Sequence, residues 1–222
     1  MSKRLGAVPP SCVSNGISII WHPAANELNG AQIPMIGVSD TDRPDLGGNF
    51  HHGDNASFMP VLWKYLVDRF GVGSVLDVGC GEGQSVRYFH RLGVVAHGID
   101  GLRLNVERAV FPIAWHDLTV GPYYMPVDMV NCIEVVEHIE EKYLTNLLDT
   151  LTNGRIICMT HAVPGQDGHH HVNCQPDEYW INHLEARGYT LSGENGTFRE
   201  IAKAEFGPRY FEASGLIFFR IS

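Results

Sequence analysis

The sequence predicts an α/β fold with a doubly wound, seven-stranded, mostly parallel sheet and an irregular N-terminal extension. From residue 57 onward, short apolar runs alternate with amphipathic helical segments, as in a parallel sheet covered on both faces. A glycine-rich loop follows the first apolar run, and acidic residues end the next two. The length of 222 residues suits one such domain with additions.

The composition is that of a globular protein, with 44% hydrophobic and 18% charged residues. No apolar run approaches the roughly 20 residues of a membrane span. The start, MSKRLGAVPP, lacks the apolar core of a secretory signal. The five cysteines include no CxxC pair, which fits a reducing compartment. We therefore expect a cytoplasmic protein without a membrane partner.

Residues 1–50 are expected to form the N-terminal extension, because Pro, Gly, Asn and Asp are frequent there and only residues 17–21 resemble a strand. The main domain then covers residues 51–222. Its first helix has apolar residues at helical spacing from Phe58 to Phe70. Ser57 is the candidate N-cap and Gly71 the stop signal.

The remaining elements follow from the same patterns. Short runs rich in Val and Ile predict strands, and longer amphipathic segments ended by Gly93 or Gly188 predict helices. The expected strands cover residues 74–78, 94–99, 113–115, 127–133, 155–160, 189–192 and 216–221. The expected helices cover residues 84–92, 102–110, 140–151, 176–188 and 196–206, and a loop rich in His and Gly covers residues 161–175.

The strongest local signal is the run Asp77-Val78-Gly79-Cys80-Gly81-Glu82-Gly83 between the first strand and the next helix. Glycines there allow a ligand to approach the backbone at a helix N-terminus. A carboxylate at Asp77 would repel pyrophosphate and suit a ligand with an amine. Asp100 closes the second strand, where it could accept both hydroxyls of a ribose. Asp117 closes the third strand, where it could bind an adenine amino group.

These motifs resemble those of the class I S-adenosylmethionine (SAM)-dependent methyltransferases, over about residues 57–221. The resemblance implies SAM as the cofactor. Asp77 would order its amino-acid end through the loop. The implied cofactor-binding residues are Asp77, Gly79, Cys80, Gly81, Asp100, Gly101, Asp117, Leu118 and Glu134.

Glu134, Glu137 and His138 form an ExxEH motif after the fourth strand. If the segment begins a helix, the three side chains project from one face. Two carboxylates and an imidazole converging on one point repel each other unless a cation lies between them. The loop over residues 168–173, with the sequence GHHHVN, offers a further ligand.

This arrangement resembles the metal-dependent small-RNA 3′-terminal 2′-O-methyltransferases, where an ExxEH motif and a later His bind one divalent ion. The resemblance implies the metal ligands Glu134, Glu137, His138 and His170, with His169 and His171 as alternatives. It also implies catalytic roles for His138, Glu134 and His170. Val172-Asn173-Cys174 departs from that family's aromatic-acid-Trp run, which weakens the substrate inference more than the metal inference.

The nitrogen and oxygen ligands suit Mn²⁺ or Mg²⁺, and two imidazoles favour Mn²⁺ or Fe²⁺ over Mg²⁺. A metal-free enzyme remains the alternative. Glu134 would then contact SAM, and His138 alone would act as a general base. In a third interpretation the motif is a solvated polar face without a catalytic role.

A bound ion could chelate two vicinal hydroxyls of a sugar and lower the pKa of one. The net charge of −9 and the sparse Lys and Arg near residues 160–180 argue against nucleic acid. The segments FMPVLWKYL, HHHVN and RYFEASGLIFFR also resemble single-domain methyltransferases that accompany glycan synthesis in bacteria and large viruses. We therefore expect O-methylation of a sugar or glycan.

Three matters stay open in the sequence. The alternative functions are RNA ribose 2′-O-methylation and an inactive methyltransferase fold that serves as a binding module. The oligomeric state could be monomer or homodimer. His161 could bind the acceptor or be a polar strand end, whereas a surface turn is favoured over a cofactor lid for His51, His52 and Asp54.

Overall fold

The computed structural model describes residues 43, 45, 46, 48, 50–204 and 210–221. Internal contacts divide the chain between Met35 and Ile36, and all features below belong to the second unit. The strand expected over residues 17–21 lies outside the described residues. The domain boundary at residue 50 stays a prediction.

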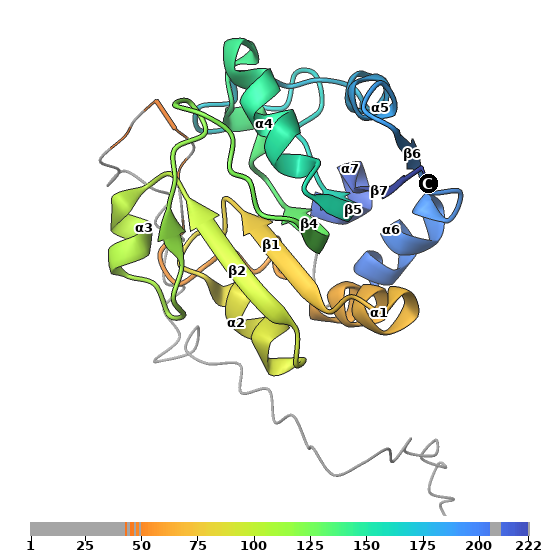
Figure 1. Ribbon diagram of the computed structural model, residues 1–222. Helices are drawn as coiled ribbons and strands as arrows, with labels where there is room; N and C mark the ends of the chain where they lie inside the picture. The colour runs from red at the N-terminus through yellow and green to blue at the C-terminus, as the bar shows by residue number, and fades with distance from the viewer. Residues whose placement is uncertain (1–42, 44, 47, 49, 205–209, 222) are drawn as a thin grey trace, which may run out of the picture. The chain divides into compact units, whose positions relative to one another are not determined.

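A seven-stranded sheet in the order β3-β2-β1-β4-β5-β7-β6 forms the centre of this unit (Figure 1). Neighbouring strands from β3 to β5 are parallel, and β7 runs antiparallel between β5 and β6. The predicted doubly wound, mostly parallel sheet is therefore confirmed. The strands are β1 (Ser74–Val78), β2 (Val95–Asp100), β3 (Ala114–Trp115), β4 (Val127–Cys132), β5 (Gly154–Met159), β6 (Tyr189–Leu191) and β7 (Leu216–Arg220).

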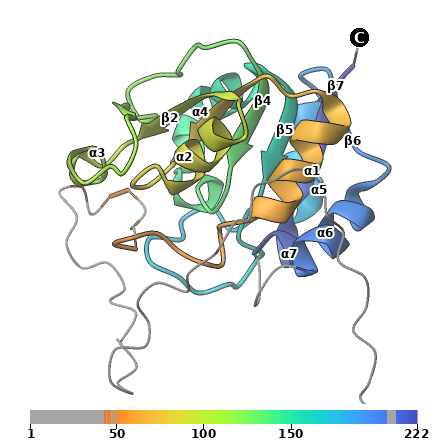
Figure 2. The same ribbon diagram turned by 90° about the horizontal axis from the view of Figure 1, so that it is seen from below.

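Helices cover both faces of the sheet (Figure 1, Figure 2). Leu147 of α4 and Trp180 of α5 belong to one buried apolar cluster, whereas Trp63 of α1, Phe89 of α2 and Phe198 of α6 belong to another. The central strands β1, β4 and β5 are thus mostly buried, which explains their nearly continuous apolar sequences. The helices are α1 (Pro60–Phe70), α2 (Gln84–Arg91), α3 (Arg103–Glu107), α4 (Leu144–Leu151), α5 (Asp177–Glu185), α6 (Asn195–Lys203) and α7 (Tyr210–Ser214).

Several helix predictions need correction. The segment expected to be helical over residues 102–110 forms only the short α3, and the segment over 140–151 begins with a 3₁₀ turn, η2 (Glu141–Tyr143). Helix α7 was not predicted at all. Ser57 does not cap α1, because Met59 precedes the first helical residue and Ser57 Oγ instead donates to the Asp54 carbonyl oxygen.

The ExxEH segment does not begin an α-helix. It forms a single 3₁₀ turn, η1 (Val136–His138), which ends because Ile139 is extended. Glu134 lies before the turn with a left-handed φ of 56°. The three motif side chains therefore do not share one helical face. Within the described residues, no helix is both long enough and apolar enough to cross a membrane.

Candidate active site

The glycine loop is held tightly against the end of β2. The amides of Gly79 and Cys80 both donate to the Ile99 carbonyl oxygen, at 2.9 and 3.1 Å. Gly79 has a φ of 66°, and a Cβ there would lie 2.4 Å from Cγ2 of Val135. Only glycine fits this position, because both the backbone conformation and the space exclude a side chain.

An open cleft lies beside this loop. The ends of β2 and β3 and the segment after β4 form its other walls. Among the predicted cofactor-binding residues, those that line the cleft are Gly79, Asp100, Gly101, Asp117, Leu118 and Glu134. Asp77, Cys80 and Gly81 are not among its lining residues.

Asp77 lies behind the loop, inside the protein. Its carboxylate accepts hydrogen bonds from Ser85 Oγ and from Asn131 Nδ2, the latter at 2.7 Å. Burial raises the pKa of Asp77 to about 6. Burial also raises the pKa of the Cys80 thiol well above its ordinary value, so that Cys80 is a poor nucleophile. Asp77 is thus placed to support the loop rather than to touch a ligand in the cleft.

Asp100 and Asp117 already have protein partners. Asp100 accepts hydrogen bonds from the amide of Gly81 at 2.9 Å and from Asn105 Nδ2 at 2.9 Å. Asp117 accepts from the amide of Thr119 and pairs with Arg43 Nη1 at 2.6 Å. Burial opposes ionisation of Asp117, but the hydrogen bonds from Thr119 and Arg43 keep its pKa below the ordinary value.

The cleft lies between the glycine loop and two carboxylates at strand ends, which is where the sequence predicts SAM. Gly79 and Gly101 border the cleft without side chains. A Cβ at Gly101 would lie 2.9 Å from Leu46 Cδ1. Carboxylates at Asp100 and Asp117 stand at the strand ends, where ligands bind in open α/β sheets. Arg43 belongs to no motif in the sequence, because it precedes the first regular element.

A second group of polar side chains adjoins this cleft. Candidate ligand atoms of Glu137, His138 and His171 all lie within 4.8 Å of one another. The amides of Val172 and Asn173 donate to the Glu137 carbonyl oxygen at 2.9 and 3.0 Å. These bonds join the loop after β5 to η1 and thereby bring the two histidines together.

Both imidazoles are oriented by backbone carbonyl groups. Nδ1 of His138 lies 3.2 Å from the His170 carbonyl oxygen, and Nδ1 of His171 lies 3.3 Å from the Gln166 carbonyl oxygen. A carbonyl oxygen can only accept, so each Nδ1 carries the proton and each Nε2 keeps its lone pair. Such outer hydrogen bonds are typical of metal-binding histidines. A Cβ at Gly168 would lie 2.3 Å from the His171 ring, so the absence of a side chain at Gly168 makes room for this imidazole.

Glu137 is fully buried, and among the described residues no N–H or hydroxyl group donates to its carboxylate oxygens, which instead contact the carboxyl group of Glu134. Burial, and then the charge of Glu134, raise the pKa of Glu137 well above its ordinary value. Burial lowers the pKa of His138 to about 4. Buried acceptors in native proteins normally have partners. Two carboxyl groups in contact, with two imidazoles beside Glu137 and no donor from a neutral group in the described part of the chain, therefore fit a divalent cation.

Glu134 and His170 lie outside this three-residue group. Glu134 lines the cleft, its amide donates to Thr160 Oγ1 at 2.7 Å, and Thr160 Oγ1 donates to Glu134 Oε1 at 2.8 Å. Burial raises the pKa of Glu134 to about 7. His170 contributes its carbonyl group to His138, while His170 Nε2 is buried and has no partner within the part of the chain that the structure describes. The geometry thus favours His171, one of the three candidates, and the assignment of His170 stays a prediction.

One further polar side chain near the site, that of Tyr210, belongs to no motif in the sequence. Tyr210 on α7 is hydrogen-bonded to Asp54. Burial and the negative charges of Asp54, Glu134 and Glu137 raise the pKa of Tyr210. Tyr210 could be recognised only from the contact between α7 and the segment before α1, which the sequence pattern does not reveal.

His161 is buried and does not line the cleft. Its Nε2 lies 3.0 Å from Asp177 Oδ1, and Asp177 Oδ2 accepts from Arg199 at 2.9 Å. These contacts connect β5, α5 and α6. They favour the interpretation of His161 as a polar strand end.

Three solved structures resemble this chain in fold. The methyltransferase domain of bacterial CtHen1 has a TM-score of 0.51 at 18% identity and covers 72% of this chain and 97% of that chain. Magnesium protoporphyrin IX methyltransferase from Synechocystis PCC 6803, with bound S-adenosylhomocysteine (SAH), has a TM-score of 0.52 at 16% identity, covering 73% and 80%. The sugar N-methyltransferase KedS8 from Streptoalloteichus has a TM-score of 0.56 at 15% identity, covering 76% and 88%.

Sequence comparisons identify the family. The ubiquinone biosynthesis O-methyltransferase of Rickettsia typhi is 31% identical over 98 residues, which are 39% of this chain and 40% of that relative. The chain therefore matches less than half the length of this relative. The family model described as a methyltransferase domain matches residues 54–193, which is 140 of the 222 residues. The protein accordingly belongs to the methyltransferase domain family.

Proposed function

We propose that the protein transfers the methyl group of SAM to a hydroxyl group of a sugar, in a glycan or a glycosylated small molecule. We further propose that Glu137, His138 and His171 hold a divalent metal ion at the acceptor. The observation that carries the proposal is the buried Glu137 carboxylate, which receives no N–H or hydroxyl donor from the described residues, contacts the Glu134 carboxyl group and lies within 4.8 Å of two imidazoles.

The position of these residues suits transfer to a diol. His138 belongs to the three-residue group and also lines the cofactor cleft, so the two sites adjoin. A divalent ion held there would supply a Lewis acid for two vicinal hydroxyls. Glu134 stands beside His138 in the cleft wall and can accept the proton that the acceptor hydroxyl loses. Thr160 holds the Glu134 carboxylate in place.

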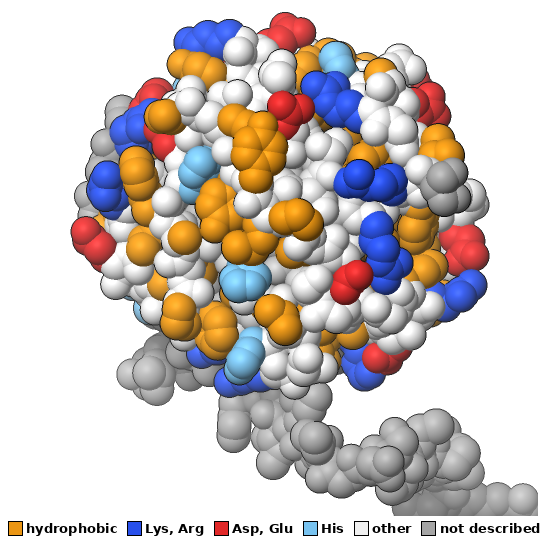
Figure 3. Space-filling view, viewed as in Figure 1, with side chains coloured by type: hydrophobic (Ala, Val, Ile, Leu, Met, Phe, Trp, Pro, Cys, Tyr) orange, Lys and Arg blue, Asp and Glu red, His pale blue; other side chains and the backbone are white. Residues whose placement is uncertain are grey.

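Charge supports a sugar over RNA as the acceptor. The net charge is −9, and residues 160–180 contain neither Lys nor Arg. On the face drawn in Figure 3, Lys and Arg side chains lie interspersed with acidic and neutral ones. An RNA acceptor would need several cations against its phosphates. The structural likeness to KedS8, named as a sugar N-methyltransferase, is compatible with a sugar acceptor in this fold.

The test is a methylation assay with a panel of hexoses and deoxyhexoses, each paired with an analogue that lacks one hydroxyl of the vicinal diol. SAH release and the position of the new methyl group, found by NMR, are the readouts. We expect methylation of a diol sugar with Mn²⁺, and loss of activity with EDTA or the deoxy analogue. Activity that EDTA leaves unchanged would contradict the proposed role of a metal ion. His138 would then remain as the candidate general base. Methyl transfer only to the 3′ ends of RNA would contradict the proposal that the acceptor is a glycan or a glycosylated small molecule.

A further inference from the structure

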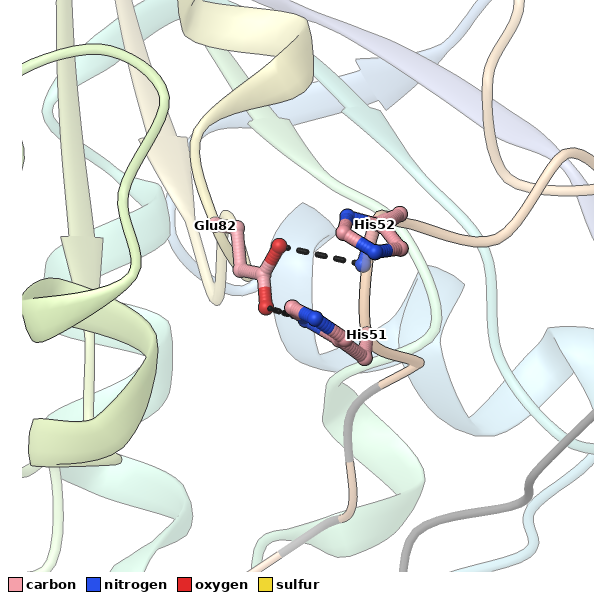
Figure 4. Close-up of side chains that lie close together, drawn as sticks. All are labelled: His51, His52 and Glu82. Carbon is pink, nitrogen blue, oxygen red and sulfur yellow. Dashed lines mark hydrogen bonds and ion pairs between the residues drawn. The ribbon is translucent and has the colours of Figure 1, made fainter. Parts of the chain in front are cut away.

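A second group of metal-type ligands lies outside the cleft, where the segment before α1 meets the glycine loop. Figure 4 shows the imidazoles of His51 and His52 on the same side of the Glu82 carboxylate. Candidate ligand atoms of the three residues all lie within 4.8 Å of one another. The two rings have centroids 3.6 Å apart and an interplanar angle of 31°.

The carboxylate of Glu82 is held in a defined position. Glu82 lies between two glycines with left-handed φ, Gly81 and Gly83, and its carbonyl oxygen accepts a hydrogen bond from the amide of Val110 at 2.9 Å. Its side chain is only 1% exposed, whereas that of His51 is 54% exposed. The carboxylate is therefore largely dehydrated, and a ligand can reach this group from the side of the histidines.

The two histidines reach Glu82 through a turn with unusual backbone geometry. His52 has a φ of 72° and Gly53 a φ of 89°, and left-handed φ is uncommon for a residue other than glycine. This conformation lets the His52 amide donate to Glu82 Oε2 at 3.0 Å while His51 Nδ1 lies 2.8 Å from Glu82 Oε1. His51 Nδ1 and Glu82 Oε1 are therefore close enough to bind one ion with bonds of roughly 2.0–2.1 Å, and a ligand atom of the His52 ring lies within 4.8 Å of both residues' ligand atoms.

We propose that His51, His52 and Glu82 form a binding site for a divalent transition-metal ion of the Zn²⁺ type. Two imidazoles and one carboxylate are a ligand set that Zn²⁺ accepts, with a remaining position for water. The same set ranks Co²⁺, Ni²⁺ and Zn²⁺ above Mn²⁺ and disfavours Mg²⁺, which prefers oxygen ligands. The ion joins the segment before α1 to the loop that borders the cofactor cleft. The proposal does not depend on the acceptor or on the metal at Glu137.

The experiment is a titration of the full-length protein with Co²⁺, followed by visible absorption, and with Zn²⁺, followed by calorimetry. Every variant carries His138→Ala, which weakens the other candidate site. His51→Ala, His52→Ala and Glu82→Gln each change one proposed ligand. His90→Ala is the matched control, because His90 is exposed and lies on the neighbouring helix α2.

We expect one Zn²⁺ or Co²⁺ per chain in the His138→Ala background and in the His90→Ala control. Each of the three ligand variants should bind at least about tenfold more weakly and lose the Co²⁺ absorption bands. Equal affinity and stoichiometry in the control and the ligand variants would overturn the proposal. His52→Ala keeps the His51–Glu82 contact, so it decides the question if His51→Ala does not fold. Sugar methylation is measured separately, so failure of either proposal leaves the other intact.

Discussion

Nδ1 of His138 lies 3.2 Å from the carbonyl oxygen of His170, while the imidazole of the next residue, His171, turns toward Glu137. His170 has a left-handed φ of 53°. This turn lets one residue contribute its backbone and the next its side chain. Sequence alignment cannot distinguish such roles among three consecutive histidines, because the difference lies in the backbone conformation of one residue.

Replacement of His171 by Ala is expected to weaken Mn²⁺ binding at least about tenfold, because one of three ligands is lost. His169→Ala is the matched control, since His169 is exposed and adjacent in sequence. Calorimetric titration with SAH present measures both. His170→Ala keeps the carbonyl group that orients His138 and should bind nearly as the wild type does. Strong loss in His170→Ala with full binding in His171→Ala would reverse the assignment.

Gly79→Ala is expected to lower the affinity for SAH at least about tenfold, because a Cβ there would lie 2.4 Å from Val135 Cγ2 and would displace the cleft wall. Gly71→Ala is the control. Gly71 also has a left-handed φ, of 59°, but a Cβ there meets no atom within 4 Å. Both variants should lose about 1 kcal/mol of unfolding free energy from the backbone. Equal SAH affinity in the two variants would mean that the contact with Val135 does not shape the cofactor site.

Thr160→Val is expected to lower kcat between about tenfold and a hundredfold, because it removes both hydrogen bonds that hold Glu134. Thr160 is a positioning residue, so the KM for SAM should change less than kcat. Thr160→Ser keeps the hydroxyl and should restore most of the rate. Steady-state kinetics with both variants provides the test, and an equal loss in both would indicate that the hydroxyl is not what matters.

The order of strands and helices could be predicted because β1, β4 and β5 are short apolar runs that are mostly buried, and helical segments alternate with them along the chain. The cleft residues Asp100 and Asp117 could be placed for a related reason, since the carboxyl ends of parallel strands meet at one edge. The short segments could not be predicted. Helix α3 has five residues and η1 three, too few for a periodic pattern.

Contacts between distant segments account for the other omissions. Arg43 reaches Asp117 across 74 positions of the sequence, and Tyr210 reaches the segment of Asp54 from the other end of the chain. Neither residue belongs to a motif. The helical geometry expected for Glu134, Glu137 and His138 was wrong. The polar groups come together because hydrogen bonds to backbone carbonyl groups join the η1 turn to the loop after β5.

The last prediction concerns Asp77, whose carboxyl group is buried and whose pKa rises to about 6. A folded-state pKa above the ordinary value means that the folded protein holds this proton more tightly than the unfolded chain does. The resulting stability is complete below about pH 4 and is lost as the pH rises through 6. The difference from the ordinary value of about 3.9 corresponds to about 3 kcal/mol.

Asp77→Asn keeps the shape of the side chain and can still accept from Asn131. Urea unfolding between pH 4 and 8 should therefore show the unfolding free energy of Asp77→Asn rising relative to wild type by up to this amount. Asp68→Asn, at a side chain that is 62% exposed, should show much less change. A wild-type minus Asp77→Asn difference that does not vary with pH would show that Asp77 is ionised in the folded protein throughout this range.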